Sequence, residues 1–437
     1  MTPAGERPAD RSEDADVIVV GAGTAGVTCT RALASGGARV IVLEAGERVG
    51  GRVWTVRDFV ETPVEAGAEF VHGVGAATWA DIRSAGLRVQ GAPNRYSWFN
   101  LGGRTRWLPL HLAHPQLWRS FDILWALRRY RGPDTNAATF MDTRGYGARA
   151  GELVALALSA HLPAGVEEVG MAGLLADGVL HLEQGLNHRV IDGYDLLPRQ
   201  IAIGLDVRFR CRVSEVSWSP GGVEVATDDG RSFRGRAAVC AVPHGVLADG
   251  RIAFVPDLPP AKSDAITRIK TGPVGKVLLH FDERFWPARM TQLVCGSGPV
   301  TLYWSTSYGT GGPPVLSAYA TGPRARALSR SGPEEAVDIV LDDLARLFPR
   351  ARPRASLRAA RVVDWLTDPN ALGGYTFLPP GALGARAALA APDTGALFWA
   401  GSATAWAPVA DTVEAAYLSG MRAARQAGAA LQGTSPV

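Results

Sequence analysis

A lysine lies in the middle of a mostly apolar run, in the segment TGPVGKVLLHFDERFW (271–286). If this segment is a β-strand, its side chains alternate between two faces, and Lys276 shares its face with Val274, Leu278 and His280. The chain contains only three lysines. A strand lysine usually reaches solvent from a sheet edge. The alternative is a buried lysine, whose pKa is lowered because desolvation disfavours the ammonium form, and such a group is suited to chemistry in a cavity.

Three glycines near the N-terminus have the spacing of a dinucleotide-binding loop. The segment VVGAGTAG places Gly21, Gly23 and Gly26 as G-x-G-x-x-G between an apolar strand-like run (16–20) and a helix-like segment. The first glycine permits a tight turn, the second lets the backbone approach a pyrophosphate, and the third lets the helix pack on the strand. The helix N-terminus then attracts the phosphates. The pattern predicts a βαβ unit with a dinucleotide site.

An acidic residue and a second glycine pair narrow the choice of dinucleotide. Glu44 ends the next strand-like run, where its carboxylate can accept hydrogen bonds from both ribose hydroxyls and repel a 2′-phosphate. NADP is therefore disfavoured. In LEAGERVGGRV, Gly51 and Arg52 provide a loop that can lie against the pyrophosphate and one face of the cofactor. An ordinary nicotinamide fold does not need this second loop.

The motifs, taken in order, resemble those of the flavin-dependent amine oxidase superfamily, which includes monoamine and polyamine oxidases and flavin histone demethylases. The resemblance extends from Asp16 to about Ala430 and is closest to polyamine oxidases. It is carried by the glycine loop and by LEA…GGR, VEAGAEFVHG, VCAVPHGVL…IAFVPDLPPAKSDAI, GKVLLHFDERFW, W-x-x-x-P-x-x-x-G-G-Y and FWAGSATAW…DTVEAAYLSGMRAA. It implies FAD as cofactor, and transfer of hydride from the carbon beside a neutral amine to flavin N5. The imine then hydrolyses, and molecular oxygen reoxidises the flavin to give hydrogen peroxide.

The resemblance also implies roles for two residues near the reaction. Lys276 corresponds to a family lysine that holds a water against flavin N5, and a water bridge can satisfy such a lysine without a carboxylate partner. His72 matches a histidine near the substrate in polyamine oxidases of the spermine-oxidising type. A hydrogen-bonded loop histidine is the alternative for His72. Glu69, three residues earlier, is expected to face either the pocket or solvent.

Further residues are expected to hold the cofactor. Thr412 and Val413 open a helix whose N–H groups can bind the flavin's pyrimidine carbonyl and whose dipole stabilises the anionic reduced flavin. Val213 matches a residue whose backbone pairs with adenine, although a core valine is the simpler reading. The loop that passes the flavin is expected to contain Glu65, Gly67 and Ala68.

The sequence also departs from the family at several positions. Ser402 replaces the glutamate of the usual AGE motif, which contacts the ribityl–pyrophosphate region. Thr412 and Val409 occupy positions where tyrosines are found in relatives. No cysteine follows Cys295, so we expect FAD to be bound non-covalently. The candidates for aromatic pocket walls are Trp304, Tyr375 and Trp406.

The predicted fold is α/β, with a Rossmann-like FAD-binding domain interleaved with an α+β substrate-binding domain whose mixed sheet is flanked by helices. The predicted FAD-binding domain comprises 15–75, 190–260 and 388–431, the substrate-binding domain 76–189 and 261–387, and flexible tails 1–14 and 432–437. The flavin should lie at the seam between the two domains. Apolar residues on 111–130 are expected to cover the pocket or to form a homodimer contact.

Composition excludes several classes of partner. The net charge of +3 (45 basic, 42 acidic) is too balanced to indicate nucleic acid or a membrane surface. Four scattered cysteines argue against a zinc site or a disulfide framework. The N-terminus has no apolar signal region and the chain has no transmembrane run, so we expect a soluble cytoplasmic protein.

Three alternatives to a polyamine-oxidase-like enzyme stay open from the sequence. An L-amino-acid oxidase would need a pocket arginine for the substrate carboxylate. A flavoprotein could instead oxidise a C–C or ring C–H bond, as related desaturases and protoporphyrinogen oxidases do. The third alternative is a non-catalytic flavin-binding module.

Overall fold

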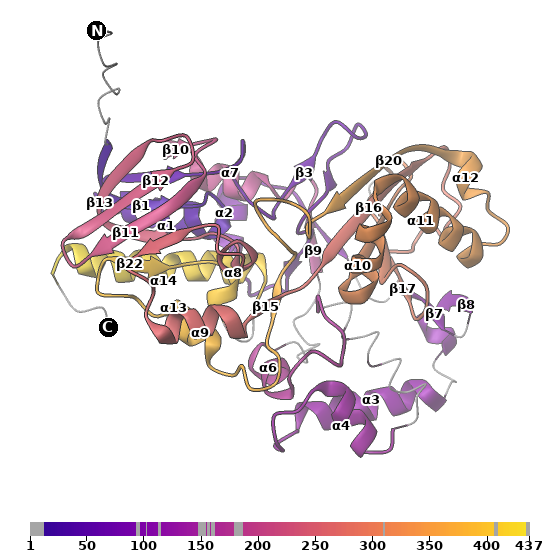
Figure 1. The fold of residues 1–437 in the computed structure, drawn as a ribbon. Helices are drawn as coiled ribbons and strands as arrows, with labels where there is room; N and C mark the ends of the chain where they lie inside the picture. The colour runs from indigo at the N-terminus through magenta and orange to yellow at the C-terminus, as the bar shows by residue number, and fades with distance from the viewer. Residues whose placement is uncertain are drawn as a thin grey trace, which may run out of the picture.

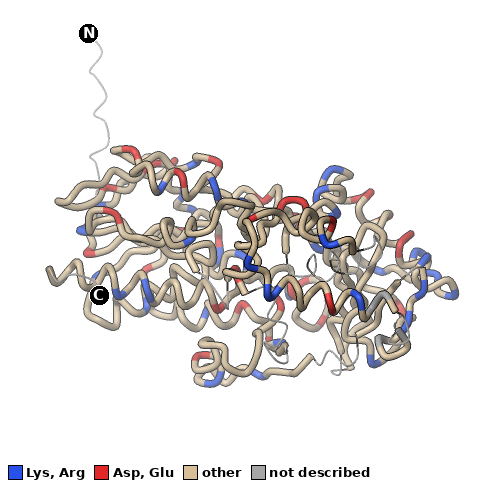
Figure 2. The backbone as a smooth tube through the Cα atoms, turned by 90° about the horizontal axis from the view of Figure 1, so that it is seen from below, with Lys and Arg blue, Asp and Glu red and all other residues tan. Residues whose placement is uncertain are grey.

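The computed structural model describes residues 13–92, 97–101, 103–111, 115–146, 154, 158, 162–178, 187–308, 311–405 and 410–433. Two large sheets lie side by side, with helices packed on each (Figure 1). Both sheets draw strands from distant parts of the chain. Basic and acidic residues are interspersed along the backbone around both sheets (Figure 2).

The first sheet has eight strands and follows the order β10-β2-β1-β13-β12-β11-β14, with β22 also paired to β13. Its strands are β1 (Glu13–Val20), β2 (Val40–Leu43), β10 (Asp206–Arg208), β11 (Val213–Ser219), β12 (Gly222–Thr227), β13 (Ser232–Cys240), β14 (Ala253–Val255) and β22 (Leu397–Trp399). β1 pairs in parallel with both β2 and β13, while β11, β12 and β13 form an antiparallel meander. The predicted βαβ unit and meander are therefore confirmed.

Helices cover both faces of this sheet because β1 and β2 are apolar on both sides. Val17 and Val19 face α1 (Thr24–Ser35) and α14 (Val413–Leu431), and the two helices share one apolar core. Ile18 and Val20 face the opposite core, which includes α9 (Pro260–Arg268) and α13 (Ala385–Ala390). Strand β22 and helix α14 thus return the end of the chain to the first sheet, as the sequence predicts.

The second sheet has seven strands and follows the order β20-β16-β19-β18-β17-β7-β8. Its strands are β7 (Ser97–Leu101), β8 (Arg104–Trp107), β16 (Val274–Phe281), β17 (Gln292–Cys295), β18 (Leu302–Ser305), β19 (Val315–Thr321) and β20 (Leu357–Asp364). All neighbouring pairs are antiparallel except β17 with β7. This is the expected mixed sheet.

The two faces of β16 follow the predicted alternation. Val277, Leu279 and Phe281 pack in a core with α11 (Pro333–Leu347), a helix predicted from its Pro-Glu-Glu start. The other face carries Val274 and Leu278 in a separate cluster. Lys276 is on this second face, so α11 and its neighbour α10 (Gly322–Ser331) do not cover it.

The remaining elements are short strands and helices that connect the two sheets or extend from them. The strands are β3 (Thr55–Val56), β4 (Val64–Glu65), β5 (Val71–His72), β6 (Val89–Ala92), β9 (Asn187–Val190), β15 (Lys270–Thr271) and β21 (Thr376–Phe377). The helices are α2 (Trp79–Ser84), η2 (Leu108–His111), α3 (Pro115–Arg128), α4 (Ala137–Thr143), α6 (Met171–Ala176), α7 (Leu196–Ala202), α8 (His244–Ala248), α12 (Pro353–Ser356) and η3 (Ser402–Thr404). In Figure 1, α3 and α4 lie below the second sheet.

Several sequence predictions extend to residues outside the described ranges. Strand β1 begins at Glu13, and residues 1–12 and 434–437 of the predicted tails are not described. The proposed domain boundaries and the role of 111–130 stay predictions. Among the helices within the described ranges, none has the length and apolar character needed to cross a membrane.

Candidate active site

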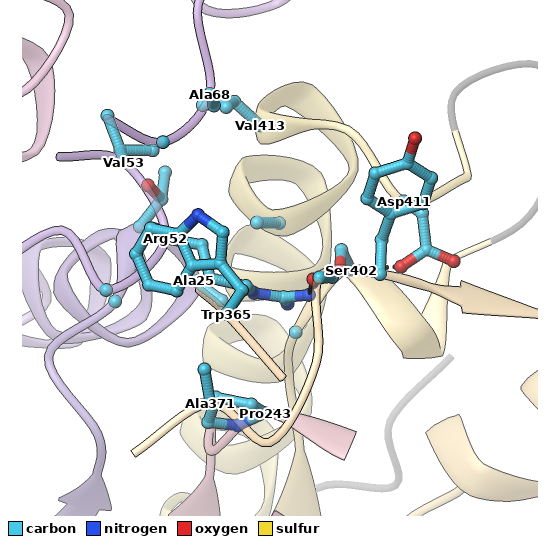
Figure 3. Close-up of a pocket in the computed structure, with 18 of the residues that line it drawn as sticks. Ala25, Arg52, Val53, Ala68, Pro243, Trp365, Ala371, Ser402, Asp411 and Val413 are labelled. Atoms are coloured by element: carbon cyan, nitrogen blue, oxygen red, sulfur yellow. Dashed lines mark hydrogen bonds between the residues drawn. The ribbon is translucent and has the colours of Figure 1, made fainter. Parts of the chain in front are cut away.

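A continuous cavity of about 860 Å³ is lined by residues of both large sheets. The glycine loop between β1 and α1 is part of this lining. Lys276 and aromatic side chains of the second sheet line the same cavity. Figure 3 shows part of this cavity, with Arg52 and Trp365 in front of the helices and Val413 at the start of one of them.

The glycine loop has the geometry that a dinucleotide site requires. Gly21 adopts a φ of +100°, and its N–H donates to the carbonyl of Leu43 at 2.8 Å. A Cβ on Gly26 would lie 1.9 Å from the carbonyl oxygen of Gly21, so the helix can pack there only on a glycine. A Cβ on Gly23 would meet no protein atom within 4 Å. Because Gly23 lines the cavity, the space beside it is open for a ligand.

An unpartnered hydroxyl at the start of α1 supports this reading. Thr24 is 4% exposed and lines the cavity, yet its Oγ1 has no hydrogen-bond partner among the described residues. Buried polar atoms are rarely left without a partner, so Thr24 fits a site for a polar ligand. Together with the free N–H groups of the helix N-terminus, it suits a pyrophosphate. Sequence reasoning missed Thr24, although its place directly after the second glycine is a usable signal.

Glu44 lies at the end of β2, where the sequence places it. Its Oε2 accepts from the Ala22 N–H and its Oε1 from the Gly46 N–H, both at 2.7 Å. These bonds aim the carboxylate into the cavity that it lines. Val213 lines the same cavity and follows Cys211, whose N–H donates to the Glu44 carbonyl at 2.8 Å. Pairing of the Val213 backbone with adenine stays a prediction.

The second glycine loop lies against the first. The Gly50 N–H donates to the Ala22 carbonyl at 2.9 Å, and Gly51 has a φ of +57°. Arg52 follows and is buried, and desolvation lowers the pKa of its guanidinium while nearby Asp411 opposes that shift. Its Nη2 donates to Ser402 Oγ at 3.2 Å.

The loop from Glu65 to Glu69 packs against Arg52. The Ala68 N–H donates to the Arg52 carbonyl at 3.0 Å. A Cβ on Gly67 would lie 1.9 Å from that same carbonyl oxygen, which explains the glycine. Gly67 and Ala68 both line the cavity, as expected for a loop that passes the cofactor.

The closing helix α14 points its N-terminus into the cavity. Thr412 is its N-cap and accepts a hydrogen bond from the Ala415 N–H at 3.0 Å. Thr412 and Val413 both line the cavity. The partial positive charge of this helix end therefore faces the space where an anionic group would be stabilised.

Lys276 is buried and paired with a carboxylate. Its side chain is 4% exposed, and Nζ lies 2.8 Å from Glu69 Oε2 and 3.0 Å from the Glu65 carbonyl oxygen. Nζ also lies 5.2 Å from the ring centroid of Trp304. The interpretation of an edge lysine reaching solvent is wrong, because β16 lies between β20 and β19. A carboxylate partner, which the water-holding role did not require, is therefore present as well.

Glu69 faces the cavity, which decides between its two expected orientations. It is 5% exposed and its carboxylate pairs with both Lys276 and Arg189. Burial opposes ionisation, but the two cations outweigh it and hold the pKa of Glu69 below its ordinary value. Arg189 was not expected from the sequence, since no motif distinguishes it among 42 arginines (45 basic residues minus three lysines).

His72 combines features of both readings proposed for it. It lines the cavity, and its Nδ1 lies 2.9 Å from Asn187 Oδ1 on the neighbouring strand β9. It is therefore a hydrogen-bonded histidine that is also accessible to a ligand in the cavity.

Aromatic rings form a wall beside Lys276. Trp304 and Tyr375 line the cavity as predicted, and Tyr319 joins them. The Tyr319 and Tyr375 hydroxyls are 2.5 Å apart, and the Trp304 and Tyr319 ring centroids are 4.9 Å apart. Sequence reasoning missed Tyr319, which is the register partner of Lys276 on β19. The predicted wall residue Trp406, and Val409, lie outside the described residues.

The fold and the cavity define a two-sheet α/β protein of the Rossmann-like class, in which a dinucleotide loop and a buried lysine line the same cavity. Residues 24–427 match the family model of the flavin containing amine oxidoreductases. The chain belongs to this family. It is therefore an FAD-dependent oxidoreductase that oxidises amines.

The similarity to known proteins extends over almost the whole chain. Polyamine oxidase 4 of Oryza sativa subsp. japonica is 29% identical over 93% of this chain and 87% of its own length. Polyamine oxidase 2 of Arabidopsis thaliana is also 29% identical, over 96% of this chain and 89% of its own length. Among solved structures, cyclohexylamine oxidase from Brevibacterium oxydans IH-35A superposes with a TM-score of 0.83 at 22% identity, covering 96% of this chain and 99% of that one. The structure of a wild-type putrescine oxidase bound to putrescine superposes with a TM-score of 0.82 at 21% identity. The match covers 94% of this chain and 98% of that one.

Proposed function

We propose that the chain is an oxidase for a small-molecule amine and that the reacting carbon lies at the Lys276 end of the cavity. The observation that carries this proposal is that the glycine loop and the buried Lys276–Glu69 pair line one and the same cavity. FAD, bound non-covalently, supplies the hydride acceptor. The products proposed are an imine, which hydrolyses in water, and hydrogen peroxide from molecular oxygen.

Lys276 is suited to hold a water in this cavity. An ammonium group has three N–H donors, and two of them point to Glu69 and to the Glu65 carbonyl. The third is available for a water molecule, and the Glu69 carboxylate keeps the lysine fixed while it holds that water. This retains the water-holding role proposed from the resemblance and adds a carboxylate to it.

The aromatic wall is suited to orient the amine and to exclude bulk water. Trp304, Tyr319 and Tyr375 present ring surfaces to the cavity, and ring faces attract cationic or apolar groups. Orientation of the C–H bond beside the nitrogen is the main task of the protein in such a reaction. His72, at the same cavity, is proposed to contact the substrate.

A polyamine is the first candidate substrate, because the motif around His72 and the named relatives both point to it. One observation favours a monoamine instead. A carboxylate without a counter-charge would suit a second ammonium group, whereas three of the five carboxylates that line the cavity, Glu69, Asp177 and Asp411, are already paired with arginine or lysine. The other two, Glu44 and Asp368, accept hydrogen bonds from backbone N–H groups. Cytoplasmic location and homodimer formation stay predictions.

Oxygen consumption and peroxide formation by the purified protein test the proposal. The panel contains putrescine, spermidine, cyclohexylamine, an L-amino acid and cyclohexanol as the matched non-amine. We expect equal amounts of oxygen consumed and peroxide formed with an amine, and neither with cyclohexanol. Turnover of putrescine or spermidine supports the polyamine candidate, and turnover of cyclohexylamine alone supports the monoamine. A protein that holds FAD but oxidises no amine of the panel contradicts the proposal.

A further inference from the structure

A buried network of alternating charges runs along one side of the cavity. Arg386 is 3% exposed, and its Nε and Nη2 each lie 2.8 Å from one carboxylate oxygen of Asp177. The same Nη2 lies 2.8 Å from Asp411 Oδ2. Asp177 and Asp411 both line the cavity. One arginine is thus shared by two carboxylates, which leaves one negative charge in excess.

Asp411 connects this network to Arg52 through Ser402. The Ser402 hydroxyl donates to Asp411 Oδ1 at 3.0 Å and accepts from Arg52 Nη2 at 3.2 Å. Figure 3 shows Ser402 between Arg52 and Asp411. With Arg52 included, two arginines balance two aspartates.

The backbone at Asp411 shows how closely its position is constrained. Its φ of +56° lies in the left-handed region, which residues other than glycine seldom occupy. Asp411 Oδ1 accepts from the Ser402 hydroxyl, and Asp411 Oδ2 accepts from Thr376 Oγ1. Hydrogen bonds to both oxygens therefore hold the side chain in place. Asp411 directly precedes Thr412, the N-cap of α14. The carboxylate is therefore held at the junction of the Arg52 loop and the helix end that faces the cofactor space.

Arg52 needs a carboxylate, and position 402 does not provide one. A buried guanidinium without a counter-charge is costly, and a serine hydroxyl is neutral. Within the described part of the chain, Asp177 is paired with Arg386 and has no hydrogen bond or ion pair to Ser402 or Arg52. Asp411 is thus the carboxylate placed to balance Arg52.

We propose that Asp411, acting through Ser402, supplies the carboxylate that fixes Arg52 for FAD binding, in place of the glutamate expected at position 402. Asp411 is a positioning residue for the cofactor. This inference rests on FAD binding by the family and is independent of which amine is oxidised.

Relocating the carboxylate tests the proposal. The dissociation constant of FAD is measured by equilibrium dialysis of purified holoprotein, for wild type, Asp411→Asn, Asp411→Ala and the double variant Ser402→Glu/Asp411→Ala. Both single variants should bind FAD weaker by roughly tenfold or more, a loss of about 1.4 kcal/mol of binding free energy. The double variant should recover to within about threefold of wild type, because its glutamate reaches Arg52 from position 402.

Asp343→Asn is the matched control, since it removes a buried carboxylate from an arginine, Arg346, while neither residue lines the cavity. Its affinity for FAD should stay within about threefold of wild type. Asp411→Asn preserves the shape of the side chain and decides the question if Asp411→Ala does not fold. Wild-type affinity in Asp411→Asn overturns the proposal, and so does a folded double variant that binds FAD no better than Asp411→Ala. Neither result bears on amine oxidation, which is measured separately on wild type.

Discussion

Lys276 and Glu69 form a buried ion pair with 2.8 Å between Nζ and Oε2, although 207 residues separate them in the chain. Lys276 comes from the middle of the second sheet, and Glu69 from the loop that packs on Arg52 and the dinucleotide loop. The pair therefore connects the second sheet to the loop that packs on Arg52. Arg189 on the other side of Glu69 leaves this group of three with one net positive charge.

Glu69→Gln should destabilise the protein and slow its reaction. The variant leaves the Lys276 ammonium and the Arg189 guanidinium buried beside a neutral amide, and breaking a buried pair in this way costs about 3–5 kcal/mol. We expect a clearly lower melting temperature and a lower rate of flavin reduction by amine. Glu61→Gln, an exposed glutamate eight positions earlier, is the control and should behave as wild type. A Glu69→Gln protein as stable and as active as wild type would show that the pair has no role.

Two glycines of one motif should respond differently to alanine. At Gly26 the new Cβ would lie 1.9 Å from the Gly21 carbonyl oxygen, so Gly26→Ala should lower the melting temperature of the apoprotein. At Gly23 the new Cβ would meet no protein atom within 4 Å, and the backbone φ of −64° suits alanine. Gly23→Ala should leave the apoprotein as stable as wild type but weaken the binding of FAD by at least about tenfold. Equal FAD affinity in Gly23→Ala would place the pyrophosphate elsewhere.

Much of the fold follows from local sequence signals. The glycine spacing with flanking apolar runs predicts β1, α1 and β2, and the alternation in 274–281 predicts which residues of β16 face α11. Both signals can be read from the sequence because the alternation of a strand and the glycines of a tight turn involve only neighbouring residues. Glu44, expected from the end of a strand-like run, and Gly67 and Thr412, expected from the resemblance, all line the cavity, and their roles toward FAD stay predictions.

The partners of the site residues were not predictable in the same way. Glu69 pairs with Lys276 and Arg189 across more than a hundred positions of chain, and no periodicity encodes such a contact. Asp411 likewise gains its role only when Ser402 and Arg52 approach it in space. Single-sequence reasoning identifies which residues can do chemistry, whereas tertiary packing decides which of them meet.

His244 should make the protein acid-sensitive. Burial lowers its pKa to about 4 from the ordinary 6.5, although a hydrogen bond to the Ile266 carbonyl opposes the shift. Between these values the unfolded chain binds a proton that the folded protein does not, so stability falls as pH falls from 6.5 to about 4. One such group contributes a slope of up to about 1.4 kcal/mol per pH unit.

Melting temperatures of His244→Gln across this pH range check the assignment. The glutamine has no imidazole to protonate, so the difference between wild type and variant should shrink as the pH is lowered. His280→Gln, which changes a half-buried histidine on β16, should follow the wild-type profile. A pH-independent difference for His244→Gln would mean that His244 does not take up the proton.

Anaerobic rapid mixing of Lys276→Met with a substrate amine, followed by mixing of the reduced protein with oxygen, tests the central claim most directly. Methionine keeps the length of the side chain but cannot hold a water or pair with Glu69. We predict that FAD stays bound while either flavin reduction or its reoxidation slows at least tenfold, a barrier change of about 1.4 kcal/mol. Rates equal to wild type in both half-reactions would contradict the account and make Lys276 a structural residue.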